Sequence, residues 1–248
     1  MSSTPSFHFS KATDADLERF VDQHLSDLLE QHGFSRYRGN GRRWHRANQE
    51  VILSVQFVLD YSVAMLYFGF QPVYFPFRFI DGPMRLHDRI WTYFEATVLH
   101  FQALPEPEQK NYISRHLFSP GATFQQGEHY RKVLEENVFP ILDCVTDNSS
   151  CHAEYRKLRN LKKTESWDPR WLLECISLGD RDECCRIAKE ILPQRSEIIP
   201  MTDDGWNPTV EKETVIRELN DGDYTRYRTL MEQFSIENRR RLKRAHFL

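Results

Sequence analysis

The densest group of residues able to do chemistry lies between positions 36 and 46, where arginines alternate with aromatic side chains and no acid is present. The arginines are Arg36, Arg38, Arg42, Arg43 and Arg46, and Tyr37, Trp44 and His45 lie among them. Guanidinium groups hold phosphates and aromatic rings stack on bases, so this composition is typical of proteins that bind single-stranded nucleic acid. The five arginines and Trp44 are therefore candidate binding residues.

A strand conformation would divide this basic segment between two faces. Successive side chains of a strand point to opposite sides, so Arg42, Trp44 and Arg46 would share one face, and Arg43 and His45 the other. Charged residues on an edge strand also prevent edge-to-edge pairing without any ligand. The whole chain has a formal net charge of −3, which gives no general attraction to nucleic acid. We therefore prefer the protective role and keep nucleic-acid binding as the alternative.

Two further polar features stand out. Gln56 lies between Val55 and Phe57 in an apolar run, so its amide must either pin neighbouring elements by hydrogen bonds or point into a pocket. We prefer the first role and count Gln56 among the candidate binding residues.

The tail NRRRLKRAHFL, residues 238–248, is a second basic run. It could contact nucleic acid or an acidic partner, although a solvated helix end whose cations complement the helix dipole is the preferred interpretation.

The cysteines and histidines form no recognisable metal or catalytic motif. The five cysteines lack the paired CxxC spacing of a zinc site, and Cys184 shares an apolar stripe with Ile187, which predicts a buried thiol. No GxSxG, HExxH, phosphate-binding glycine loop or GxGxxG is present. The sequence predicts no metal and no cofactor. An enzyme is left open, with Gln56, His45 or Glu95 contributing to a cleft between sheet and helices.

The first element expected to position these residues is a helix from residue 13 to residue 32. Apolar residues recur there at three- and four-residue steps and form one stripe: Leu17, Phe20, Val21, Leu25, Leu28 and Leu29. Thr13 and Asp16 fit a capping box, and Gly33 fits the left-handed residue that ends a helix.

A change to alternating hydrophobicity after Phe34 predicts an antiparallel sheet. Asn40-Gly41 suits a two-residue hairpin turn, and the runs EVILSVQFVL and SVAMLYFGF alternate, which gives three or four strands with one face able to bury. Val51, Leu53, Val55, Phe57 and Leu59 share one face of the central run. Pro72 and Pro76 are expected to end the sheet, because proline cannot serve an internal ladder.

From Pro83 onward the pattern is helical and ends in two similar hairpins. The stretches SWDPRW, residues 166–171, and GWNPTV, residues 205–210, each place Asp or Asn before a proline, which is a way to start a helix. Gly-Asp pairs at 179–180 and 222–223 are predicted to end one helix and cap the next. Chance similarity is the alternative, because repeat arrays usually need three or more units.

The composition is that of a folded globular protein. The chain has 248 residues, of which 40% are hydrophobic and 28% charged. The first twenty residues lack the basic-then-apolar pattern of a secretory signal, and no apolar run approaches the ~20 residues that span a bilayer. The odd number of cysteines and the adjacent Cys184 and Cys185 favour reduced thiols. These features predict a cytoplasmic location and no membrane partner.

A set of short motifs covers the first third of the chain. They are the helix end Gly33-Phe34, then Gly39-Asn40, Trp44, Arg46, Gln56 and Phe68-Gly69-Phe70. Together they resemble an uncharacterised bacterial family, domain of unknown function 4304. The chain departs from the family near the last motif, where the family carries an asparagine and a small aliphatic residue. The resemblance implies an α+β fold and a bacterial source, and it implies no reaction.

The sequence therefore predicts an α+β protein, with an N-terminal helix on a three- or four-stranded antiparallel meander and an all-helical region ending in two helical hairpins. Residues 1–82 are predicted to form the helix and sheet, and residues 83–248 the helical region, packed on the sheet as one structural unit. The preferred function is a non-enzymatic protein-interaction module, an adaptor or immunity-type protein. The alternatives are a nucleic-acid-binding protein that uses Arg36 to Arg46 and an enzyme with a site in the sheet–helix cleft.

Overall fold

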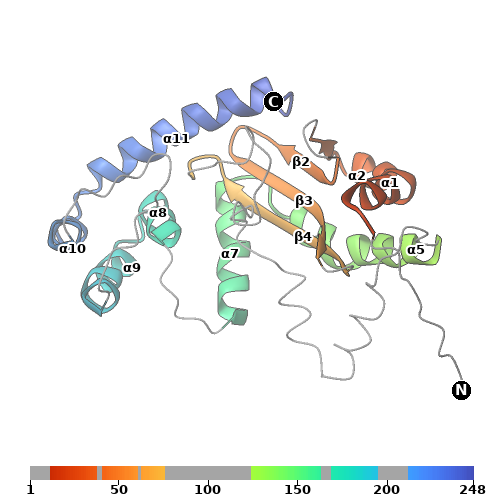
Figure 1. Cartoon of the computed structure of the whole chain (residues 1–248). Coiled ribbons are helices and arrows are strands. Elements are labelled where there is room, and N and C mark those ends of the chain that lie inside the picture. Colours follow the sequence, from red (N-terminus) through yellow and green to blue (C-terminus); the bar gives the residue numbers. More distant parts are fainter. Residues whose placement is uncertain (1–11, 38–40, 61–62, 76–123, 163–168, 195–211) are drawn as a thin grey trace, which may run out of the picture.

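The computed structural model describes residues 12–37, 41–60, 63–75, 124–162, 169–194 and 212–248. They form N-terminal helices, a four-stranded antiparallel sheet and a C-terminal helical region that ends in two hairpins (Figure 1). The predicted α+β class is confirmed. The aromatic segment from Pro76 to Phe101, with Glu95, lies outside the described residues.

The N-terminal helix is divided in two, as α1 (Asp14–His24) and α2 (Ser26–Gln31). Thr13 and Asp16 form the predicted capping box, and Gly33 has a φ of 75°, the left-handed conformation expected after a helix. The single helix predicted from 13 to 32 is wrong at Leu25, which leaves the helical region with φ −129° and ψ −19°. At this break the His24 carbonyl accepts a 2.9 Å hydrogen bond from Arg131, a long-range contact that a local pattern does not reveal.

The sheet contains β1 (Ser35–Arg36), β2 (Arg43–Ala47), β3 (Val51–Asp60) and β4 (Val63–Pro72), in that order and antiparallel throughout. Trp44 pairs with Val55, and Val55 with Phe68. The last strand ends at Pro72, as predicted. The proposed turn residue Asn40 lies outside the described residues.

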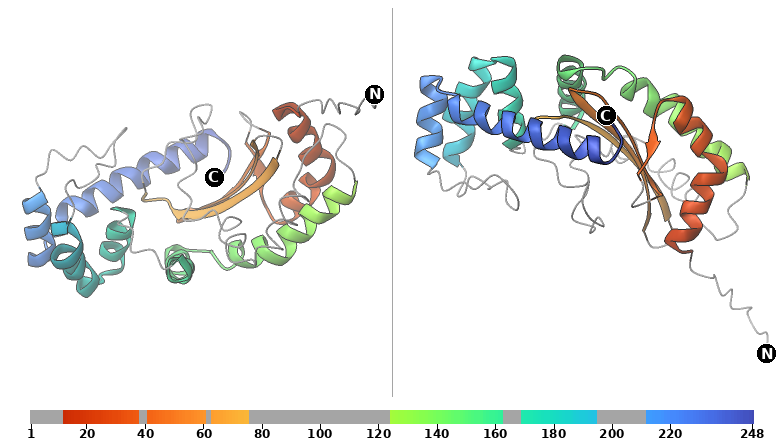
Figure 2. Two further views of the ribbon diagram at one scale, coloured as in Figure 1. Left: turned by 60° about the horizontal axis from the view of Figure 1, so that its bottom comes forward. Right: turned by 90° about the horizontal axis from the view of Figure 1, so that it is seen from above.

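The two faces of the sheet meet different elements. The predicted face of β3 is buried in the main core, where it packs with side chains of the helices α1 and α2. The opposite face carries Ile52 and Val73, which form a small second cluster with Leu242 near the C-terminus. Figure 2 shows the sheet between the N-terminal helices on one side and the end of the C-terminal helix on the other. The alternation of β3 therefore predicted correctly which side chains enter the main core, but not that the opposite face, with Ile52, Ser54 and Gln56, is buried as well.

A second group of helices follows the sheet, comprising α5 (Phe124–Val133), η1 (Leu134–Val138), α6 (Phe139–Leu142) and α7 (Asn148–Lys162). These elements agree with the helical pattern predicted after Pro83, but the segment between α5 and α6 is a wider π-helical turn. Pro140, the second residue of α6, has no N–H to donate to the preceding turn, which favours a local departure from α-helical bonding. The helix α7 packs against β4.

The first C-terminal hairpin consists of α8 (Pro169–Leu178) and α9 (Arg181–Arg186), continued by η2 (Ile187–Ile191) and η3 (Leu192–Gln194). Pro169 is the first residue of α8, as predicted. Gly179 has a φ of 70°, and the Asp180 carboxylate accepts a hydrogen bond from the Glu183 amide, so the joint has the predicted Gly-Asp chemistry. The other helix-start residues, Asp168, Asn207 and Pro208, lie outside the described residues.

The second hairpin consists of α10 (Lys212–Asp221) and α11 (Thr225–Arg244). Gly222 has a φ of 75°. Asp223 accepts a 3.1 Å hydrogen bond from the Thr225 amide, although Tyr224 occupies the N-cap position. The helix α10 packs on α9 and η2, and α11 packs on α8, so the two hairpins stack on each other. In Figure 1, α11 runs from α10 to the sheet.

Candidate functional site

Two arginines of the basic segment, Arg36 and Arg42, are paired with acids of α1. Arg36 forms an ion pair with Glu18 and donates a 3.1 Å hydrogen bond to Asp22. Arg42 donates a 2.5 Å hydrogen bond to Asp14. These contacts hold the β1–β2 hairpin against α1. They also neutralise the positive charge that would otherwise attract a phosphate group.

Arg46 is a structural tie between three elements. Its guanidinium donates to the Asp143 carboxylate and the His32 carbonyl, each at 2.7 Å, and to the Leu142 carbonyl at 3.0 Å. It also lies over the Phe34 ring, with 5.0 Å between the guanidinium carbon and the ring centroid. Arg46 therefore joins β2 to the ends of α2 and α6.

The remaining predicted binding residues lie in different places. Trp44 is buried in the main core, whereas Arg43, 1% exposed, points to the opposite face of the sheet. Gln56 pairs with Arg43 across the ladder and shares that face. Arg38 lies outside the described residues. The structure thus divides the predicted set between the α1 side, the core and the second sheet face.

That second face carries an enclosed histidine. His45 Nδ1 lies 2.8 Å from Ser54 Oγ, and its ring is 5.2 Å from the Phe247 ring and 6.0 Å from that of Tyr37. Burial, followed by the nearby charge of Arg43, lowers the pKa of His45 to about 3. A general base works best with a pKa near the operating pH, so this neutral, enclosed imidazole is poorly suited to that role.

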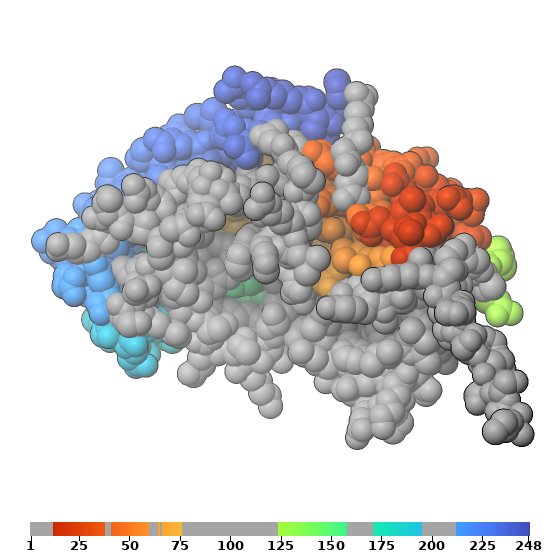
Figure 3. Space-filling view, viewed as in Figure 1, coloured from red at the N-terminus to blue at the C-terminus, as the bar shows by residue number. Residues whose placement is uncertain are grey.

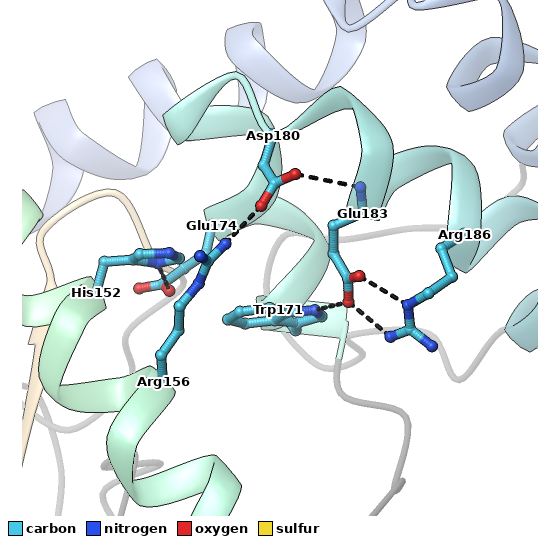
Figure 4. A network of polar contacts seen from close by, with 7 residues as sticks. All are labelled: His152, Arg156, Trp171, Glu174, Asp180, Glu183 and Arg186. Atoms are coloured by element: carbon cyan, nitrogen blue, oxygen red, sulfur yellow. Dashed lines mark hydrogen bonds and ion pairs between the residues drawn. The ribbon is translucent and has the colours of Figure 1, made fainter.

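The most unusual polar arrangement joins α7 to α8 (Figure 4). His152 Nδ1 donates to the carboxylate of Glu174, which is 0% exposed. The imidazole stacks on Trp171, with centroids 5.6 Å apart and planes inclined by 5°. Glu174 Oε1 and His152 Nε2 have no hydrogen-bond partner in the described part of the chain. In the described part of the chain, the buried carboxyl group of Glu174 is thus held by a single histidine.

The network continues outward to α9. The Trp171 indole and the Arg186 guanidinium both donate to Glu183, at 2.7 Å and 2.6 Å. Arg156 of α7 pairs with Asp180, the residue that caps α9. Figure 4 shows these residues as one connected group that spans α7, α8 and α9. The group fixes the first hairpin against the helix that packs on the sheet.

Sequence reasoning missed this network, although a signal was present. Glu174 is the one acid in the apolar helix sequence WLLECISL, and a single acid in such a run predicts a buried, paired carboxylate. Chemically, a carboxylate that orients an imidazole is one part of a catalytic arrangement. The adjacent Cys151 does not supply a nucleophile, because burial and the charge of Glu174 raise the pKa of its thiol well above the usual range. The geometry fits a clamp between helices.

A cavity of about 330 Å³ lies beside Arg46, at the turn between β2 and β3. Its lining consists of Arg46, Ala47, Asn48, Val51, Leu53, Asp143, Val145 and Thr146. Of the predicted binding residues, Arg46 lines this cavity. The sequence did not indicate the cavity, because its two walls are separated by about a hundred positions in the chain.

The described residues contain neither a metal-ligand cluster nor a membrane-spanning helix. Within the described ranges, no group of three or more His, Cys, Asp and Glu side chains could hold a metal ion. In the same residues, no helix is long and apolar enough to cross a bilayer. Cys151, Cys175 and Cys184 are buried free thiols, and Cys144 is exposed.

Comparison with known proteins gives no relative from which to transfer a function. No protein-family model matches the chain, and neither the curated proteins nor the solved structures contain a significant match. The resemblance of the first third to domain of unknown function 4304 stays a prediction based on its short motifs.

Proposed function

We propose that this protein is a non-enzymatic protein-interaction module that binds another protein through the outward face of α11. The helix is 20 residues long and belongs to a pair of stacked hairpins. Stacked helical hairpins commonly present extended surfaces to protein partners. Figure 3 shows α11 along the upper edge of the molecule, away from the N-terminal helices.

The inward face of α11 is firmly held. Asn238 donates hydrogen bonds to the Val73 and Phe75 carbonyls, at 2.7 Å and 2.6 Å. Leu242, one turn further on, is fully buried in the second cluster. The opposite side of the helix faces solvent. Because α11 is already held in place, a partner that binds there does not have to order the helix, which lowers the entropic cost of binding.

The outward face combines an apolar side chain with a group of cations, and this combination carries the proposal. Ile236 is 61% exposed. Arg240 and Lys243 follow it by four and seven positions on the same face, and Arg244 is adjacent. In the described part of the chain no salt bridge joins these three cations to an acid, in contrast to Arg36. The nearest acid is Glu237, whose pKa is lowered by its hydrogen bond to Arg241 and, to a smaller extent, by the charges of Arg240 and Arg244, so cations outnumber acids on this part of α11. A partner with an acidic surface around an apolar pocket would complement this face.

Photo-crosslinking tests the proposal with a matched position. We expect a benzophenone amino acid at position 236, in the full chain in native lysate, to give one discrete protein adduct. The same residue at exposed position 128 on α5 should not give it. The double change Arg240→Glu and Lys243→Glu should weaken that adduct, and Lys189→Glu on the exposed side of η2 should leave it intact. Identical adducts from positions 236 and 128 would rule out the surface.

Nucleic-acid binding is the second candidate, favoured by the same exposed cations of α11. The ion pairs of Arg36 and Arg42 with acids of α1 weigh against nucleic-acid binding by the segment Arg36 to Arg46. A fluorescent single-stranded oligonucleotide distinguishes the two candidates, because its binding should weaken steeply with added salt. If Arg240→Glu with Lys243→Glu abolishes oligonucleotide binding while no protein adduct forms, nucleic acid is the partner.

A further inference from the structure

The segment that follows α11 folds back over the end of the helix. The Phe247 amide donates a hydrogen bond to the Leu242 carbonyl at 2.9 Å. The His246 amide donates one to the Lys243 carbonyl at 3.1 Å. This pair of bonds is a Schellman turn, which satisfies carbonyls that would otherwise have no partner within the helix. Figure 1 shows the end of the chain beside α11, next to β2. The last turn of α11 is therefore closed by the residues that come after it.

Phe247 anchors this segment on the second face of the sheet. Its ring lies edge-on to the His45 ring, with centroids 5.2 Å apart, and stacks on the Tyr37 ring at 6.4 Å. Phe247 also packs against the second cluster, to which Leu242 and Ile52 belong. An apolar contact of this kind commonly accompanies the hydrogen bonds of a Schellman turn. The turn is thus held by aromatic packing as well as by its amides.

The backbone of His246 opposes this closed arrangement. Its φ is 61°, and in the described part of the chain it is the one residue other than glycine with a positive φ. This left-handed conformation is unfavourable for a residue that has a Cβ atom. Gly179 and Gly222 adopt the same conformation at the other helix ends without that cost. The His246 residue is itself exposed to solvent. Closure of the turn therefore depends on the contacts of Phe247.

We propose that residues 245–248 form a strap that opens and closes on the second sheet face, and that its closure orders the last turn of α11 for partner binding. This inference rests on the proposed function, because Lys243 and Arg244 of the binding face belong to that turn. An open strap would leave the turn without its closing hydrogen bonds, so a partner would bear the entropic cost of ordering it. Partner binding should in return favour the closed strap, because such coupling is reciprocal.

Amide hydrogen exchange of the full chain, followed by NMR, tests the strap without a partner. His246→Gly removes the unfavourable conformation and should raise the protection factor of the residue 247 amide about fivefold. His246→Ala removes the same imidazole but keeps a Cβ atom, so its protection factor should match that of the unmodified chain. Phe247→Ala removes the anchor and should lower the protection factor of the same amide about tenfold. The amides of β3 serve as the reference and should exchange at unchanged rates in all variants.

Equal protection in His246→Gly and His246→Ala, or full protection in Phe247→Ala, would overturn the strap. The protein adduct formed from position 236 in native lysate then tests the effect on binding. Its yield should rise in His246→Gly and fall in Phe247→Ala. Altered exchange with equal adduct yields would show that the strap opens but does not control binding. If the unmodified helix forms no adduct, the proposed function fails and the control of binding fails with it, whereas the protection factors still decide whether the strap opens.

Discussion

Replacing His152 by leucine isolates the cost of leaving a buried carboxylate without its partner. Glu174 is fully buried, and its single hydrogen bond in the described part of the chain comes from His152. Removing one member of a buried ion pair typically costs about 3–5 kcal/mol. We expect the free energy of unfolding of His152→Leu to fall by that amount. In a chain of this length the melting temperature would fall by about 6–20 °C.

The double variant His152→Leu with Glu174→Met separates this charge effect from loss of packing. Both replacements are apolar and similar in size to the originals, and such exchanges of a buried pair are often neutral or stabilising by about 1–4 kcal/mol. The double variant should therefore be more stable than His152→Leu alone. Lys157→Gln, which breaks a solvent-exposed pair with Glu154 on the same helix, should leave the free energy of unfolding almost unchanged.

Urea unfolding followed by far-ultraviolet circular dichroism measures these differences without relying on Trp171, whose fluorescence would change with its stacking partner. The slope of free energy against urea must stay the same for the comparison to hold. A double variant that is as unstable as His152→Leu would refute the argument, because the loss would then come from the missing imidazole contacts and not from an unpaired charge.

Three other predictions concern single side chains. Burial lowers the pKa of His45 to about 3, whereas a histidine in the unfolded chain has a pKa of ~6.5. The stability that the neutral ring gives the folded state is therefore complete above pH ~6.5. Below that pH the free energy of unfolding falls by up to ~1.4 kcal/mol per pH unit as the pH approaches 3. His45→Asn should flatten the pH dependence of the unfolding free energy in that window, and an unchanged slope would contradict this. Asn238→Leu removes the donor to two carbonyls after β4 and should cost about 2–4 kcal/mol, with faster amide hydrogen exchange at residues 73–75; wild-type exchange there would argue against it. A thiol reagent at pH 8 should modify exposed Cys144 first, because burial raises the pKa of Cys184 to about 11; equal modification rates by mass spectrometry would be inconsistent with this packing.

Local chemistry predicted the beginnings and ends of elements best. The Thr13–Asp16 capping box, the left-handed Gly179 and Gly222 and the proline start of α8 depend on neighbours within four residues, and they are present as expected. The break at Leu25 was not predicted, because the apolar stripe runs through it without interruption. Its His24 carbonyl is bonded by Arg131, more than a hundred positions away.

The candidate site was harder to predict because charge pairing is a long-range property. Asp14, Glu18 and Asp22 recur every four residues and therefore form an acidic stripe along α1. That stripe was visible in the sequence, but its position opposite Arg36 and Arg42 follows only from how the hairpin packs. Composition alone thus overstated the positive charge that the basic segment presents to solvent.

The proposed choice of α11 over the basic hairpin as the binding surface rests on the same packing. Arg36, Arg42 and Arg46 are held by acids and Arg43 is buried. A partner would therefore have to displace intramolecular contacts of these described arginines before gaining its own. On α11 the anchoring and recognising residues occupy opposite faces, with Asn238 and Leu242 inside and Ile236 and Arg240 outside. It follows that Asn238→Leu should weaken partner binding together with stability, because it loosens the helix, whereas Arg240→Glu should weaken binding and leave stability unchanged.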